Sequence, residues 1–248
     1  MPRSSRYLRE GYTYHLTHRC HDRRFLLKFA RDRDVYRRWL RVAVQRYKVP
    51  VYNFTITGNH VHLIVHVDSV ERVGQMMDLV AGCFARQLNR RKGHEGSVWE
   101  HPYHCTIIQD GRHLLNCLKY VSLNMVRAGV VEHPSDWRWC GHDELLGMRK
   151  RYRILAVDRL LESLAIDRIE DLRSVYVDGI TKQLETRVLV REPCWTEALA
   201  VGSRSFVERI AHGTRNRSRF RYTDWEEISG STAGSVQEPG EAYSPFST

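Results

Sequence analysis

The chain has 248 residues, of which 42% are hydrophobic, so it is long enough for one large domain with an ordinary core. Its formal net charge is +10, and the stretch from Thr223 onward holds five acidic residues without Lys or Arg, which leaves +15 on residues 1–222. This positive charge favours a protein that binds a polyanion, most simply nucleic acid, over a basic protein that has no such partner. No run approaches the ~20 apolar residues of a membrane span, and the six cysteines form no C-x-x-C pair. We expect a cytoplasmic protein that keeps its thiols reduced and has no membrane partner.

Hydrophobic periodicity divides the first half of the chain into strands and helices. Alternation and β-forming residues predict strands over 12–19, 51–57, 59–67 and 103–109. Helical spacing predicts helices over 32–48, from Asp68 or Ser69 to about Lys92, and from Asp110 to about Met125. The order β-α-β-β-α-β followed by a helix predicts an α+β, ferredoxin-like (RRM-like) fold, with an antiparallel sheet and packed helices.

The second half of the chain gives weaker signals. We expect residues 1–148 to form the functional domain and residues 149–222 a basic, mainly helical C-terminal extension. Four arginines near the end of that extension could lie on phosphates: Arg215, Arg217, Arg219 and Arg221. Residues 223–248, rich in Ser, Gly, Pro and Glu, are typical of a disordered acidic tail.

A histidine pair stands on the predicted strand over residues 59–67. Successive side chains of a strand point to opposite faces, so Val61 and Leu63 fall on a core face and His60 and His62 on the other. A half-buried strand of this kind presents the two imidazoles side by side, where they could hold one divalent metal ion. A solvated sheet face is the competing interpretation, and the pair alone does not decide between them.

The helix predicted over 110–125 carries a second informative pattern. Leu114 and Leu118 belong to an apolar stripe, whereas Asn116, Tyr120 and Asn124 form a polar stripe that is largely turned away from it. On this interpretation the core does not need Tyr120. A tyrosine that packs sideways with its hydroxyl at the surface remains the ordinary alternative.

Together the two patterns make chemical sense. A phenol can attack phosphorus if a metal ion neutralises the phosphate and a neighbouring group takes the phenolic proton. His60, His62 and the amide oxygen of Asn124 could hold such an ion, with Mg²⁺ or Mn²⁺ as the candidates. The product would be a covalent phosphotyrosine on Tyr120.

Several segments together resemble a known family. Asn59-His60-Val61-His62-Leu63 and the block from Tyr120 to Val131, with its Y-x-x-x-N-x-V-R-A-G pattern, resemble the HUH tyrosine transposases, specifically the REP-associated tyrosine transposases (RAYT). The similarity covers most of residues 1–140 and extends to the Asn89-Arg90-Arg91 segment. Met125 stands where this block usually has proline, which predicts a longer third helix.

The resemblance implies a metal-dependent endonuclease and strand transferase that acts on single-stranded DNA beside hairpins and keeps the 5′ phosphate on a tyrosine. Carried onto this chain, it makes Tyr120 the nucleophile, His60, His62 and Asn124 the metal ligands, and Arg127 a phosphate contact. We expect Arg90 and Arg91 to bind nucleic acid as well.

Two other functions stay open at this point. One is a non-catalytic protein that binds hairpin nucleic acid and derives from a transposase. The other is a metal-dependent phosphodiesterase that uses activated water, with Tyr120 as a bystander. The sequence is compatible with a monomer or a homodimer.

Overall fold

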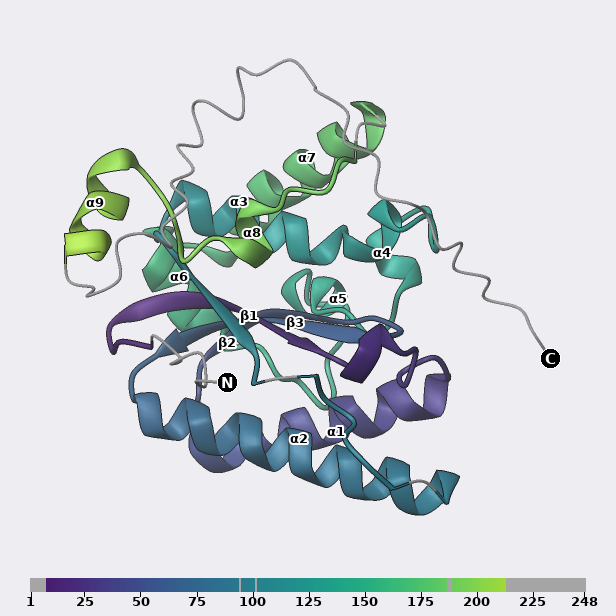
Figure 1. The fold of residues 1–248 in the computed structure, drawn as a ribbon. Coiled ribbons are helices and arrows are strands. Elements are labelled where there is room, and N and C mark those ends of the chain that lie inside the picture. Colours follow the sequence, from purple (N-terminus) through teal and green to yellow (C-terminus); the bar gives the residue numbers. More distant parts are fainter. Residues whose placement is uncertain (1–7, 94, 101, 187–188, 213–248) are drawn as a thin grey trace.

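A five-stranded sheet forms the centre of this computed structural model, which describes residues 8–93, 95–100, 102–186 and 189–212 (Figure 1). In spatial order the strands are β2 (Val51–Ile56), β3 (His60–Val67), β1 (Tyr12–Arg19), β4 (His104–Ile108) and β5 (Ala200–Val201). The first four pair antiparallel. With α1 (Ala30–Tyr47) and α2 (Val70–Lys92) they follow the predicted β-α-β-β-α-β order, so the predicted α+β, ferredoxin-like fold is confirmed.

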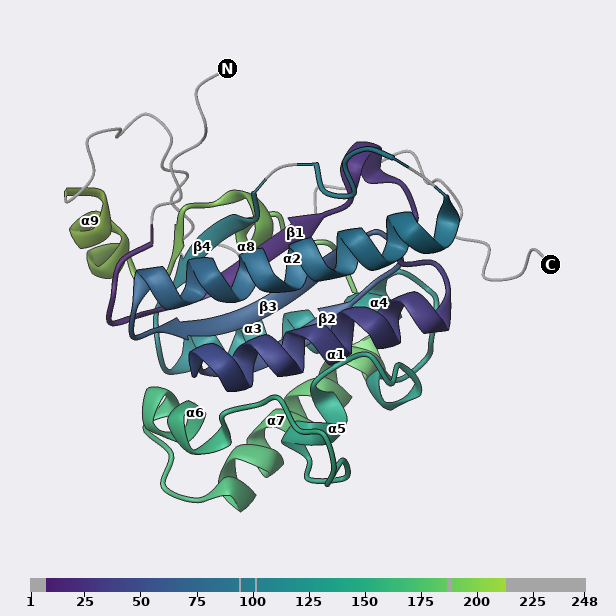
Figure 2. The same cartoon turned by 90° about the horizontal axis from the view of Figure 1, so that it is seen from below.

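Helices α1 and α2 lie side by side across one face of the sheet (Figure 2). The Ser69 hydroxyl accepts a hydrogen bond from the Arg72 amide at the start of α2, which is one of the two caps that the sequence predicted. Gly93 ends the same helix with a φ of 58°, a conformation that glycine adopts without a Cβ penalty. The two helices bury an apolar and aromatic layer against the sheet, in which Tyr36 packs on Phe84.

A second layer covers the opposite face of the sheet (Figure 1). It includes α3 (Arg112–Ser122), α4 (Asn124–Arg127) and α8 (Cys194–Glu197). Strand side chains bind the backbone of α3: Asn53 donates to the Leu118 carbonyl at 3.0 Å and Thr55 to the Val121 carbonyl at 2.7 Å. Both faces of β3 are therefore covered, and the prediction of a half-buried histidine strand is wrong: His62 is only 2% exposed.

The third helix differs from its prediction at both ends. It begins at Arg112 rather than Asp110, because Gly111 turns the chain with a φ of 73° and the Asp110 carboxylate instead accepts a hydrogen bond from Thr13. Leu123 interrupts it with a φ of −81° and a ψ of 3°, and one further turn, α4, follows. The expected lengthening at Met125 does not occur.

The C-terminal part of the described chain is largely helical, as predicted. Its helices are α5 (His142–Leu145), α6 (Val157–Leu164), α7 (Ile169–Thr186), α8 and α9 (Arg204–His212), and short 3₁₀ turns lie at His21–Arg23 and Pro134–Asp136. The sequence did not predict β5, which lies parallel to β4 at the sheet edge. No described helix is long and apolar enough to span a bilayer. The predicted tail over 223–248 and the four arginines from Arg215 to Arg221 fall outside the described residues.

Candidate active site beneath the third helix

Three histidines from two neighbouring strands form a chain of close contacts under α3. His62 Nδ1 lies 2.8 Å from His15 Nε2, and His62 Nε2 lies 2.9 Å from His60 Nε2. His15, at one end of this row of histidines, is held by a further contact, because its Nδ1 lies 2.7 Å from the Trp195 carbonyl oxygen. His15 and His62 are almost completely buried, which lowers the pKa of His15 to about 4 and that of His62 well below its ordinary value.

These contacts determine which nitrogens carry protons. A carbonyl oxygen only accepts, so His15 Nδ1 carries hydrogen and donates to Trp195. Because burial keeps His15 neutral, its Nε2 accepts, and the hydrogen between the two rings belongs to His62 Nδ1. His62 Nε2 therefore carries no hydrogen and can accept, and the Asn124 side-chain NH₂ group lies 3.1 Å from it. The Trp195 carbonyl thus orients His15, and His15 orients His62. Metal-binding histidines commonly have a hydrogen-bond partner of this kind on the nitrogen that does not bind the metal.

His60 reaches the same state from the other side. Its Nδ1 lies 2.6 Å from the Asn59 side-chain oxygen and 3.0 Å from the Thr57 hydroxyl, so it donates and the lone pair is at Nε2. Burial, followed by the charge of Arg19, lowers the pKa of His60 to about 3. Both histidines thus present unprotonated Nε2 atoms toward one point.

The spacing of these two nitrogens fits one metal ion. Ligands held ~2.1 Å from an ion at a right angle lie about 3 Å apart, and the two Nε2 atoms are 2.9 Å apart. Asn124 lies at the same point, with its side-chain nitrogen 3.1 Å from His62 Nε2. Rotation of that amide exchanges its NH₂ group for its oxygen, a ligand that hard cations prefer. In the described part of the chain no set of three or more His, Cys, Asp or Glu side chains could hold a metal, so this site would combine two imidazoles with an amide.

Tyr120 lies against this histidine cluster from α3. Its ring centre is 6.2 Å from that of His15 and 6.3 Å from that of His62, so the structure brings the predicted nucleophile to the predicted metal ligands. The side chain is 4% exposed, and the prediction that it turns away from the core is wrong, because Trp195 covers it with ring centres 5.9 Å apart. Burial raises the pKa of Tyr120 to about 12.

Arg127 opposes that effect of burial. Its guanidinium carbon lies 4.2 Å from the centre of the Tyr120 ring, and its charge lowers the pKa of the phenol. One of its nitrogens, Nη2, donates to the Tyr120 carbonyl at 3.3 Å, while Nε and Nη1 are buried without a hydrogen-bond partner in the described chain. The predicted phosphate contact is therefore placed beside the tyrosine with donors to spare.

A segment from the C-terminal extension completes the site. Besides Trp195, it supplies Glu192, whose carboxylate accepts a hydrogen bond from the Trp195 indole at 2.7 Å and interacts electrostatically with Arg127. Sequence patterns did not predict this segment. The contact between His15 and Trp195 spans 180 positions, and no local pattern predicts such a pair.

Other predicted residues are not brought to the site. Arg90 and Arg91 lie at the end of α2, in the layer on the opposite face of the sheet, where Arg91 is paired with Asp32 (Figures 1 and 2). Their assignment to nucleic-acid binding stays a prediction.

Comparison with known proteins shows what the chain is similar to. Residues 9–124 match the family model described as "Transposase IS200 like", a range that includes the histidine pair, Tyr120 and Asn124. The family resemblance predicted from the motifs is thereby confirmed.

Two relatives are more specific. The "Putative REP-associated tyrosine transposase" of Haemophilus influenzae is 26% identical over 103 residues, which cover 38% of this chain and 58% of that relative. The chain thus matches less than two thirds of the relative's length. A solved structure described as "Structure of the REP associates tyrosine transposase bound to a REP hairpin" covers 62% of this chain and 90% of its own, at 19% identity and a TM-score of 0.48.

Proposed function

We propose that the protein is a metal-dependent endonuclease and strand transferase that acts on single-stranded DNA beside hairpins. Tyr120 would be the nucleophile, and His60, His62 and Asn124 would hold Mg²⁺ or Mn²⁺. One observation carries the proposal: a tyrosine ring lies about 6 Å from an imidazole whose unprotonated Nε2 converges with that of a second histidine. Preference for hairpins rests on the sequence resemblance.

The chemistry follows from these groups. The Tyr120 oxygen forms a bond to phosphorus and gives up its phenolic proton, while the 3′ oxygen of the preceding nucleotide leaves with the electron pair of its bond and takes up a proton, so one proton is lost and one is gained. The 5′ phosphate stays on Tyr120, and attack by a 3′ hydroxyl reverses the step and joins strands. A bound divalent ion would neutralise charge on the phosphate. Arg127 favours the phenolate electrostatically and has two unused donors for a phosphate oxygen.

The experiment is a covalent-adduct assay. Labelled single-stranded hairpin oligonucleotides are incubated with the protein and Mn²⁺ or Mg²⁺ and then separated on a denaturing gel. We expect a slowly migrating protein–DNA band that requires added metal, disappears with a chelator and is absent from Tyr120→Phe.

The alternatives predict other outcomes. DNA cleavage that survives Tyr120→Phe would assign the site to a phosphodiesterase that uses activated water. Tight hairpin binding without adduct or cleavage, across a broad set of hairpins, would assign the protein to the non-catalytic binders.

A further inference from the structure

A small cleft continues from the histidine pair along the sheet. The β-sheet register aligns His62 with Thr17 on β1, and Thr17 with His104 on β4, while Arg19 is aligned with His60. Residues directly opposite each other in antiparallel strands point to the same face. Thr17, Arg19 and His104 line a cleft of about 260 Å³. These residues lie on the same face of the sheet as His60 and His62, so the cleft is adjacent to the candidate metal ligands.

Two polar groups in this cleft have no partner in the described part of the protein. Thr17 is only 7% exposed, and its hydroxyl oxygen is buried without a hydrogen bond. His104 Nδ1 is in the same condition, and burial lowers the pKa of this imidazole, so the ring is neutral. Buried hydroxyl and imidazole groups rarely stay unsatisfied. A ligand with oxygen acceptors would satisfy both.

The charge around the cleft favours an anion. Three arginines line it, Arg19, Arg23 and Arg191, against two carboxylates, Glu100 and Glu197. Glu197 accepts from Arg191 at 3.0 Å and holds that side chain at the rim. Arg19 and Arg191 also act electrostatically on His60, so their positive charge extends to the candidate catalytic centre. A phosphate there would lie within reach of guanidinium groups and of the two unsatisfied donors.

We infer that this cleft binds a phosphodiester of the unpaired DNA strand next to the phosphate that Tyr120 attacks. The inference rests on the proposed function, because a strand whose phosphate lies at Tyr120 must continue past the site, and the polar row beside His62 provides a path. Arg191 lies beyond residues 9–124, so the family match supplies no role for it.

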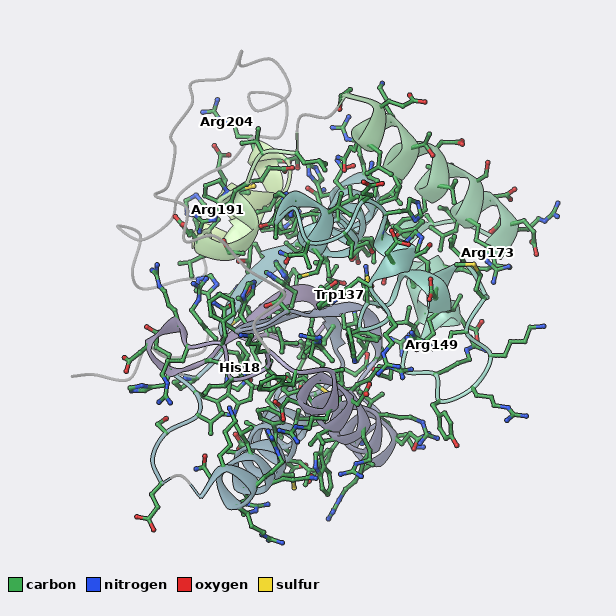
Figure 3. The ribbon with its side chains drawn as sticks, turned by 90° about the vertical axis from the view of Figure 1, so that its right-hand side faces the viewer. His18, Trp137, Arg149, Arg173, Arg191 and Arg204 are labelled. Atoms are coloured by element: carbon green, nitrogen blue, oxygen red, sulfur yellow. The ribbon has the colours of Figure 1, made fainter. Side chains whose placement is uncertain are left out.

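A second basic cleft, of about 600 Å³, provides a matched control. It is lined by Arg149, Arg168 and Arg173, and Figure 3 shows Arg149 and Arg173 on the opposite side of the view from Arg191. Arg149 and Arg173 donate to backbone carbonyls of the same region, so they are used in packing. Arg168 is exposed and forms one ion pair, with Glu170.

The test measures binding of a hairpin oligonucleotide with and without an unpaired thymidine flank, using the full chain at several salt concentrations. Arg191→Gln is expected to weaken binding of the flanked hairpin about 5- to 10-fold and to reduce its salt dependence by about one phosphate contact. Binding of the blunt hairpin should not change. Arg168→Gln removes one positive charge from the second cleft. It should change the affinity for neither the flanked nor the blunt hairpin.

Thr17→Val separates a ligand role from a packing role. Valine keeps the branched shape and removes an unsatisfied hydroxyl, so the melting temperature should stay or rise, while binding of the flanked hairpin weakens about 3- to 10-fold. Loss of affinity that is equal for flanked and blunt hairpins would overturn the inference. So would Arg191→Gln and Thr17→Val proteins that bind both as the unmodified protein does.

The two proposals fail in different ways. If the adduct forms but affinity for the flanked hairpin does not change in Arg191→Gln and Thr17→Val, the cleft has another role and the catalytic proposal stands. If flank binding depends on both residues and no adduct forms with any metal, the proposed chemistry fails while the cleft remains a nucleic-acid site.

Discussion

Each face of the sheet buries a tyrosine, and the side chains around the two tyrosines differ. Tyr36 on α1 is fully buried among Phe84 and Trp99, with ring centres 5.6 and 5.8 Å away. Tyr120 on α3 is almost as buried, but among two imidazoles, an indole and a guanidinium. Burial raises the pKa of both phenols, and only at Tyr120 does an adjacent cation oppose it. Burial therefore does not distinguish the candidate site from the core, whereas the converging imidazole nitrogens and the guanidinium over the phenol ring do.

The largest expected effect comes from exchanging the two tyrosines for phenylalanine. Tyr120→Phe removes the oxygen of the proposed nucleophile, so the covalent adduct should disappear completely. Tyr36→Phe removes a hydroxyl that has no hydrogen-bond partner in the described chain, so adduct formation should persist and the free energy of unfolding should change by less than ~1 kcal/mol. Gel assays and urea unfolding on both proteins make the comparison. Equal adduct yields from the two would remove Tyr120 from the mechanism.

The next effect concerns the histidine strand itself. His62→Ala deletes a candidate ligand and should weaken Mn²⁺ binding more than about 100-fold, since loss of an outer-shell partner alone costs 10- to 100-fold. His66, four residues along the same strand, instead lies 3.2 Å from the Thr13 hydroxyl and 3.6 Å from Asp68. His66→Ala should leave Mn²⁺ affinity unchanged, as followed by paramagnetic resonance of the free ion. Equal losses would show that the metal site lies elsewhere on β3.

A smaller effect is expected at His15, which supports His62 and is not itself a ligand. His15→Leu removes the hydrogen bonds that His15 makes to His62 Nδ1 and to the Trp195 carbonyl and should weaken Mn²⁺ binding about 10- to 100-fold. Glutamine can accept from His62 with its oxygen and donate to Trp195 with its nitrogen. His15→Gln should therefore restore affinity to within about threefold of the unmodified chain. If both variants lose affinity alike, His15 acts through packing and not through the hydrogen-bond relay.

The sequence predicted the elements whose information is local. Alternation predicted β1 with its observed bounds and β3 to within one residue. A four-residue spacing predicted that Tyr120 and Asn124 share one side, and both lie next to the histidines, although Asn124 belongs to α4. It erred where a distant segment determines the environment. Trp195 covers Tyr120 and fixes His15, and Ala200–Val201 adds a strand. Two residues give no periodic signal, and a contact across 180 positions is a property of the folded chain.

The smallest effect tests whether buried histidines also affect stability away from the candidate site. His142 on α5 lies 2.9 Å from the Tyr176 hydroxyl, and burial, with a minor contribution from His133, lowers its pKa from 6.5 to about 4. Above pH 6.5 both folded and unfolded chains keep this ring neutral. As the pH falls from 6.5 toward 4, only the unfolded chain takes up the proton, so the folded state loses stability over that window.

Between pH 7 and pH 5 this single group should lower the free energy of unfolding by about 2 kcal/mol, since one pKa unit corresponds to ~1.4 kcal/mol. His142→Gln removes the titration and should make the difference between urea unfolding curves at the two pH values smaller by that amount, whatever the substitution does to stability at pH 7. The matched comparison is His21→Gln: the exposed His21 side chain pairs with Asp22 outside the core. A pH difference that is unchanged in His142→Gln would mean that His142 takes up its proton in the folded state as readily as in the unfolded state, and that burial in the helical layer around α5 does not keep imidazoles neutral as burial under α3 does.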